Sequence, residues 1–150
     1  MNAYPAYVLD TSVAVKWFAN EGGADQARAD QLLDAVGNGQ CILRAPDLLL
    51  FELANALMLS HKFPSARVLN SITLLQKLKI EVVPLNLATL TRAVEIASSC
   101  NATIYDSYFL ALAFETDSTL VSADEVFLRK ARHLPNIISL RRFQLTEQTL

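Results

Sequence analysis

The stretch "AYVLDTSVAVKWFANE", residues 6–21, decides the fold, because a short apolar run in it ends on an aspartate. The run is β-prone and stops at Asp10, and the bulky residues that follow, up to Phe18, recur at helical spacing. Asp10 has two interpretations. It caps the N-terminus of the next helix, or it belongs to a site at the carboxyl edge of a sheet, where open α/β folds place their sites.

Length and composition predict one domain over residues 1–150 with a substantial core. The chain is 52% hydrophobic and has only 4 Gly and 5 Pro, which leaves little room for long loops. No apolar run reaches the ~20 residues that span a bilayer, and the N-terminus lacks the features of a signal peptide. Cys41 and Cys100 are isolated in apolar sequence. We therefore expect a cytoplasmic protein with buried, reduced cysteines and without a Cys or His metal site.

The overall charge does not indicate a nucleic-acid-binding protein. The net charge is −2 and the pI is about 5.6, whereas such proteins are usually basic. Basic residues nevertheless gather near the end of the chain, at Arg129, Lys130, Arg132, Arg141 and Arg142. They form either a solvated surface or a local patch that attracts phosphates.

Strand-like and helix-like segments alternate along the chain. The predicted strands are 6–10, 41–45, 80–84, 119–122 and 137–140. A short helix that follows the first strand is predicted to end near residue 17. The other predicted helices cover about 24–36, 47–62, 64–78, 86–99, 103–116 and 123–132. Such alternation predicts the α/β class, with parallel strands joined by right-handed crossovers and covered by helices on both faces.

Two further acids occupy unusual positions. Asp124 follows strand 119–122, but Ser122 and Glu125 form a capping box for the next helix, so Asp124 is surplus to that task. Asp106 opens the helix of "NATIYDSYFLALAFE", which is apolar nearly all round. Asp106 either belongs to a capping box with Thr103 or faces an interior cleft.

Glu52 lies in "PDLLLFELANALMLS", a helix without a polar face, which predicts burial on most sides. An unpaired carboxylate there is costly, so Glu52 needs a cation. Lys16 is one candidate partner, and a metal ion is the other. A cluster of carboxylates without Cys or His selects a hard ion, Mg²⁺ or Mn²⁺ with Ca²⁺ as an alternative, and Mg²⁺ suits phosphate substrates.

Four stretches together resemble the PIN domain family, in particular the VapC-type toxin ribonucleases of toxin–antitoxin systems. They are "YVLDTSVAVKWF", "APDLLLFELANAL", "TIYDSYFLALA" and "TLVSADEVFLRKA". The resemblance covers nearly the whole chain and implies a single three-layer α/β/α domain. Its central parallel sheet of about five strands has the order 3-2-1-4-5.

The resemblance also implies site residues and an activity. The implied metal-binding and catalytic acids are Asp10, Glu52, Asp106 and Asp124, with Ser12, Asn55 and Ser122 as polar supports. The implied activity is Mg²⁺- or Mn²⁺-dependent hydrolysis of RNA phosphodiesters, leaving 5′-phosphate and 3′-hydroxyl ends. The implied partners are RNA, a cognate antitoxin and a second copy of the chain.

Other functions remain alternatives at this stage. A PIN-like module that only binds RNA or protein needs no complete acid set. Haloacid-dehalogenase-like phosphatases need a second acid where this chain has Ser12, and receiver domains need an adjacent acid pair on the first strand. Helix 64–78 carries apolar residues at helical spacing that indicate either core packing or a partner surface: Val68, Leu69, Ile72, Leu75 and Leu78.

Overall fold

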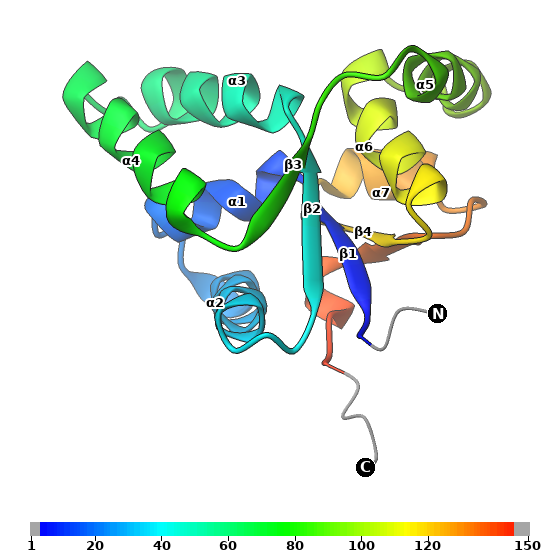
Figure 1. Ribbon diagram of the computed structural model, residues 1–150. Coiled ribbons are helices and arrows are strands. Elements are labelled where there is room, and N and C mark those ends of the chain that lie inside the picture. The colour runs from blue at the N-terminus through cyan, green and yellow to red at the C-terminus, as the bar shows by residue number, and fades with distance from the viewer. Residues whose placement is uncertain (1–3, 146–150) are drawn as a thin grey trace.

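The computed structural model describes residues 4–145; residues 1–3, which belong to the N-terminus considered above, and residues 146–150 lie outside this range. Five parallel strands form one sheet in the predicted order β3-β2-β1-β4-β5 (Figure 1). The strands are β1 (Ala6–Leu9), β2 (Ile42–Pro46), β3 (Ile80–Val83), β4 (Thr119–Ser122) and β5 (Ile137–Ser139).

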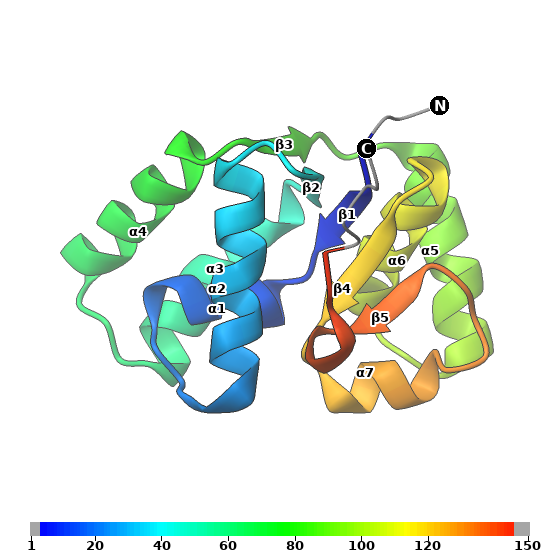
Figure 2. The ribbon, with the colours of Figure 1, turned by 90° about the horizontal axis from the view of Figure 1, so that it is seen from below.

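Helices cover both faces of the sheet, which confirms the predicted α/β/α layers. Helices α1 to α4 lie on one side and α5 and α6 on the other, and α7 lies beside β5 (Figures 1 and 2). The helices are α1 (Thr11–Phe18), α2 (Gly23–Gly37), α3 (Leu48–Asn55), α4 (Ser65–Lys77), α5 (Leu87–Cys100), α6 (Ile104–Glu115) and α7 (Glu125–Lys130). A π-helical turn, Ala56–Ser60, extends α3, and a 3₁₀ turn, Leu140–Arg142, follows β5.

The two central strands end side by side. Val8 and Leu9 of β1 and Leu120 and Val121 of β4 are fully buried, as expected for strands covered on both faces. Leu9 is paired with Val121. Because parallel strands end at the same edge of a sheet, Asp10 emerges next to the end of β4.

Helix α6 fills the core on the other face. Its residues from Ser107 to Ala113 are all buried, which confirms the prediction of an almost fully buried helix. The helix packs against β1, β2 and β4. Asp106 in its first turn is therefore carried to the same edge of the sheet as Asp10.

The prediction that the Glu52 helix is buried on most sides is wrong. Leu49, Leu53 and Leu57 form the buried stripe of α3 and its π-helical extension, but Phe51 is 78% exposed and Met58 is exposed too. Beside this stripe, Leu48, Leu50 and Ala54 are partly buried against the core, and the outer side of the helix faces solvent. Its outer apolar side chains form a surface, and the sequence pattern alone does not distinguish an exposed apolar face from a buried one.

Helix α4 also has buried and exposed apolar side chains. Val68 and Leu75 are buried in the core, which confirms core packing for them, whereas Leu69 is exposed.

Cys41 and Cys100 are buried and unpaired, as predicted. Within residues 4–145, none of the helices combines the length and the apolar character that a bilayer span requires.

Candidate metal site at the carboxyl edge of the sheet

All four predicted acids line one cavity, the acidic cleft, at the carboxyl edge of the sheet. Its volume is about 290 Å³. Its lining is Asp10, Thr11, Ser12, Glu52, Asn55, Ala56, Ser60, Asp106 and Asp124. The acids come from the end of β1, from α3, from the first turn of α6 and from the start of α7. The fold thus brings together side chains that are far apart in the sequence.

Asp10 is the most deeply placed acid, with 6% of its surface exposed. Its Oδ2 accepts hydrogen bonds from the Ser12 amide (3.3 Å), from the Ser12 hydroxyl and from the Ser122 hydroxyl (3.1 Å). The amide contact caps α1, which confirms the capping interpretation. Asp10 also lines the cleft at the carboxyl edge of the sheet, and its part in a functional site stays a prediction. No described residue donates to its other carboxyl oxygen, Oδ1, which is left available to a ligand.

Ser12 and Ser122 join the two strand ends. Besides contacting Asp10, the Ser12 hydroxyl accepts from the Ala123 amide (2.9 Å), and the Ser122 hydroxyl accepts from the Asp124 amide (3.1 Å). Ser122 is fully buried. These bonds fix the start of α1 against the start of α7 and hold Asp10 in one orientation.

The structure corrects the predicted capping box at α7. Asp124, not Ser122, caps this helix, because its Oδ1 accepts from the amides of Val126 (3.0 Å) and Phe127 (3.1 Å). Ser122 is still part of β4, paired with Ser139, so its backbone does not occupy the cap position. Asp124 was therefore not surplus to capping, yet its second carboxyl oxygen accepts no hydrogen bond from residues 4–145.

Glu52 is positioned by Thr11, whose hydroxyl donates to Glu52 Oε1 at 2.7 Å. Lys16, the alternative partner, pairs instead with Glu21 at 3.1 Å. Asn55 lines the same cleft, and its role in orienting Glu52 stays a prediction. Thr11 and Ser60 also line the cleft, but they were not among the predicted site residues. Thr11 has one signal in the sequence, its position next to Asp10, and Ser60 has none.

Asp106 lies near the exposed side of the cleft. The Thr103 hydroxyl accepts from its amide at 3.1 Å and caps α6, which confirms the predicted contact. On α7, Lys130 donates to the Asn101 carbonyl at 2.9 Å, close enough for its charge to act on Asp106.

Burial raises the pKa of three of these acids. It raises the pKa of Asp10 to about 6, against hydrogen bonds from Ser12 and Ser122 that lower it. Burial also raises the pKa of Glu52, with the Thr11 hydrogen bond opposing and the charge of Asp106 adding to the rise. The pKa of Asp106 is raised by burial and by Asp124, and the bond to Thr103 and the charge of Lys130 offset part of that rise. The cleft therefore holds negative charge that the protein compensates only in part.

The cleft fits a hard divalent cation. Every donor is an oxygen, and none of the four acids has a Lys, Arg or His nitrogen within 4 Å among residues 4–145. In the same range, no group of three or more acidic, His or Cys side chains is arranged to hold a metal by itself. Mg²⁺ commonly binds to one or two carboxylates and keeps several waters, so a Mg²⁺ ion in the cleft would need water for the rest of its shell.

The sequence matches the profile of a known family. The profile described as "PIN domain" covers residues 7–133. No curated protein sequence is significantly similar to the chain.

Solved structures share the fold. VapBC2 from Rickettsia felis, bound to a promoter DNA fragment, has a TM-score of 0.66 at 14% identity over 89% of this chain and 96% of that one. VapC20 from Mycobacterium tuberculosis, a sarcin–ricin loop cleaving toxin, has a TM-score of 0.66 at 13% identity over 82% and 93%. A toxin–antitoxin complex from Klebsiella pneumoniae has a TM-score of 0.64 at 14% identity over 89% and 97%.

The raised pKa of Asp10 predicts a pH-dependent effect of Asp10→Asn on the metal-free protein. The folded state takes up the proton of Asp10 near pH 6, against 3.8 for the ordinary carboxyl. Proton binding by Asp10 therefore stabilises the folded state relative to the unfolded state. This stabilisation is complete below about pH 3.8 and is lost as the pH rises through 6. The loss amounts to about 3 kcal/mol at 1.36 kcal/mol per pH unit. Relative to wild type, the variant should gain roughly this free energy of unfolding between pH 4 and pH 7.5, measured by urea unfolding with EDTA present.

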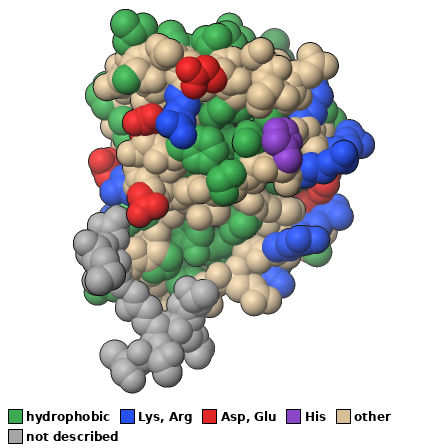
Figure 3. All heavy atoms as spheres, turned by 90° about the vertical axis from the view of Figure 1, so that its right-hand side faces the viewer, with side chains coloured by type: hydrophobic (Ala, Val, Ile, Leu, Met, Phe, Trp, Pro, Cys, Tyr) green, Lys and Arg blue, Asp and Glu red, His purple; other side chains and the backbone are tan. Residues whose placement is uncertain are grey.

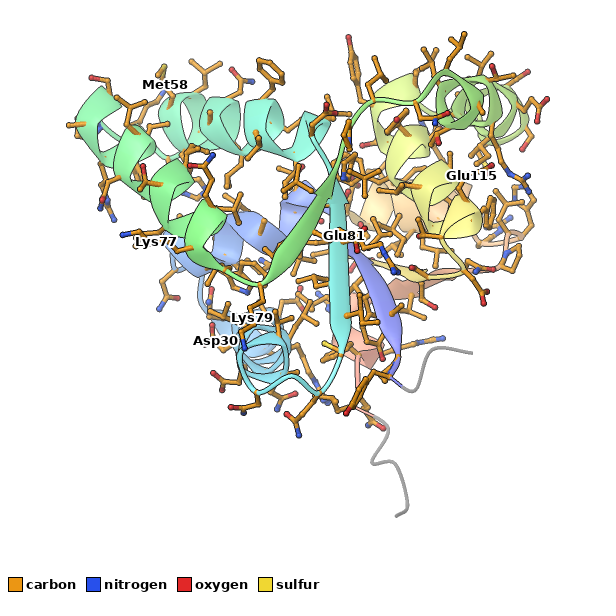
Figure 4. All side chains as sticks on the ribbon, in the orientation of Figure 1. Asp30, Met58, Lys77, Lys79, Glu81 and Glu115 are labelled. Carbon is orange, nitrogen blue, oxygen red and sulfur yellow. The ribbon has the colours of Figure 1, made fainter. Side chains whose placement is uncertain are left out.

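Asp30→Asn is the matched control, because Asp30 is exposed on α2 near the opposite end of the sheet (Figure 4). The control tests whether removing a carboxylate outside the cleft gives the same gain as Asp10→Asn. An Asp10→Asn effect that is independent of pH contradicts the prediction.

Proposed function

The chain belongs to the PIN domain family, and from that premise we propose that it is a Mg²⁺- or Mn²⁺-dependent ribonuclease that hydrolyses RNA phosphodiester bonds. The convergence of Asp10, Glu52, Asp106 and Asp124 in one cleft supports this proposal. The burial of Asp10, which raises its pKa to about 6, leaves its charge only partly compensated by the protein. A divalent cation bound in the cleft would supply the rest of that compensation.

The four acids have different roles in the proposed reaction. Asp10 and Asp124 bind the cation, directly or through water, with the carboxyl oxygens that the described residues leave unbonded. Glu52 and Asp106 either complete the set of cation ligands or orient the attacking water. Thr11 holds Glu52, and Ser12 and Ser122 hold Asp10.

The bound cation supplies charge neutralisation at the phosphoryl oxygens and lowers the pKa of a bound water. The protein's own share is orientation and proton acceptance. Raised pKa values at Glu52 and Asp106 make these carboxylates better proton acceptors than ordinary exposed ones. No side chain needs to form a covalent bond to the substrate.

We predict that Asp10→Asn and Asp106→Asn each lower the rate of metal-dependent RNA cleavage by a factor of at least roughly 10² and leave the fold intact. Each change removes negative charge but keeps the size of the side chain. The assay incubates purified protein with total tRNA and ribosomal RNA in Mg²⁺ or Mn²⁺, and the ends of the products are mapped. Removing the metal with EDTA should stop cleavage, and restoring Mn²⁺ should recover it.

Asp30→Asn again serves as the control and should cleave like wild type. Full activity in either cleft variant contradicts the assigned roles. Mn²⁺ binding without cleavage of any RNA instead favours the module that only binds RNA or protein.

We further propose that the chain is the cytoplasmic toxin of a toxin–antitoxin pair, inhibited by a cognate antitoxin. The structures that share this fold include a toxin–antitoxin complex from Klebsiella pneumoniae. A ribonuclease of broad effect requires such an inhibitor in the cell that makes it.

Induced expression in a bacterial host tests this role. The wild-type chain should stop growth, and Asp106→Asn should not, because this variant should no longer cleave RNA. Co-expression of the small reading frame next to the gene should restore growth. Normal growth with wild-type protein present at the level of the variant contradicts the toxin assignment.

A homodimer is the third part of the proposal, and we assign its contact to the apolar rim, defined as Phe51, Leu85, Ile104 and Tyr105. These exposed side chains surround a cavity of about 270 Å³ between α3 and α6. Exposed apolar patches of this kind mark protein interfaces. The rim adjoins the cleft, because Phe51 precedes Glu52 and Tyr105 precedes Asp106.

Phe51→Glu and Leu85→Glu should each convert a dimer into a monomer, because each places an unpaired charge in an apolar contact. Sedimentation analysis measures the mass. Leu69→Glu on the exposed side of α4 is the control and should stay dimeric. A wild-type monomer at high concentration, or dimeric rim variants, rules out this interface.

A further inference from the structure

A second cavity lies beside the acidic cleft and is basic. This basic groove has a volume of about 490 Å³ and is lined by residues of α7, of the edge strand β5 and of the segments next to them. Figure 2 shows α7 beside β5. Its charged lining is Arg129, Arg132, Arg141, Arg142 and Glu125. Four guanidinium groups against one carboxylate give the groove a strong positive charge, although the chain as a whole is acidic.

Most of this charge is not neutralised by the protein. Arg141 lies 3.2 Å from Asp25 and 3.9 Å from Glu125. Within residues 4–145, by contrast, Arg129, Arg132 and Arg142 have no acidic side chain within 4 Å. All four arginines are exposed, and Figure 3 shows lysine and arginine side chains gathered at the right-hand margin of one face.

Neighbouring residues line the groove and the cleft. Ser139 lines the groove and is paired with Ser122, whose hydroxyl bonds Asp10 in the cleft. Neighbouring strands lie about 4.8 Å apart. At the start of α7, Asp124 lines the cleft and the next residue, Glu125, lines the groove. The two cavities are therefore close enough for a polynucleotide bound in the cleft to extend to the groove.

The chemistry of the groove suits a polynucleotide better than a peptide. Guanidinium groups match phosphate oxygens in a two-pronged geometry, and Leu134, Ile137 and Ile138 give an apolar floor on which the faces of bases can rest. A peptide that added a strand to the sheet would rely on backbone hydrogen bonds. Strand β5 has only 3 residues and offers few of them.

We propose that the basic groove binds the sugar–phosphate backbone of the RNA next to the bond that is cut. This inference rests on the proposed ribonuclease function and extends it, because it assigns the direction in which the substrate leaves the cleft. Contacts to phosphates carry no sequence preference by themselves. The groove therefore contributes affinity, and the identity of the RNA is read elsewhere.

The test compares two double variants with the same loss of charge. Arg129→Gln with Arg132→Gln removes two groove arginines. Lys77→Gln with Lys79→Gln removes two exposed lysines on the other side of the molecule (Figure 4). Binding of a short fluorescein-labelled single-stranded RNA is measured by anisotropy in Mg²⁺, in the Asp10→Asn background so that the RNA stays intact. Hydrolysis of bis(p-nitrophenyl) phosphate, which is too small to reach the groove, is measured with Asp10 present.

The groove variant should bind RNA roughly tenfold more weakly at 0.1 M salt, and the slope of log Kd against log salt should fall by about 0.7 for each lost contact. Its hydrolysis of the small diester should equal that of wild type, and the lysine variant should behave like wild type in both assays. Arg132→Gln with Arg142→Gln gives a second groove variant that leaves the last turn of α7 unchanged.

Unchanged RNA affinity and salt dependence in both groove variants overturn the inference. Binding of poly-glutamate to the same variants is measured as well. If the groove variants lose poly-glutamate binding but keep their RNA affinity, the groove binds an acidic protein segment and the inference is overturned. RNA binding through the groove without cleavage by the wild-type chain refutes the proposed ribonuclease function, and the groove is then an RNA-binding site without an adjacent cleavage site. Cleavage by groove variants whose RNA affinity is intact supports the proposed ribonuclease function and refutes the inference about the groove.

Discussion

The buried carboxylate of Asp10 is the feature on which the other parts of the site depend. A charge this deep in the protein is unfavourable, and three hydrogen bonds to one oxygen offset only part of the cost, since the pKa of Asp10 is still raised to about 6. The strand order fixes its place, because β1 is central and β4 is its neighbour. Ser122 can then reach Asp10 from the adjacent strand. The arrangement is understandable if the missing compensation is a cation from solution.

The other acids are built on the same pattern. Asp10, Glu52 and Asp124 each use one carboxyl oxygen for a bond within the protein, to Ser12, to Thr11 and to the amides of α7. The remaining oxygen of each has no partner among residues 4–145. Internal bonds thus orient the carboxylates before any ligand arrives, which lowers the cost of ordering them on binding. The basic groove beside them supplies the opposite charge, so one edge of the molecule can attract both the cation and a polyanion.

Much of this was accessible from the sequence. The alternation of apolar strands and amphipathic helices predicted the sheet. The helix and strand bounds differ from the predicted ones by at most two residues, when α3 and its π-helical extension are counted as the one helix predicted over 47–62. The acids were recognisable because Asp10 follows a buried strand and Glu52 interrupts an apolar helix. Other features depend on three-dimensional neighbours that no local pattern encodes. These are the bond from Thr11 to Glu52, the capping of α7 by Asp124 and the exposure of Phe51.

Anomalous diffraction from crystals soaked in Mn²⁺ measures whether the acids hold a divalent cation. We expect an anomalous peak inside the acidic cleft, within coordination distance of Asp10 Oδ1 or the unbonded oxygen of Asp124, and its absence in Asp10→Asn crystals. A cleft without a peak at saturating Mn²⁺, with the four carboxylates ordered, contradicts the account. A guanidinium or ammonium group seated between those carboxylates does so equally.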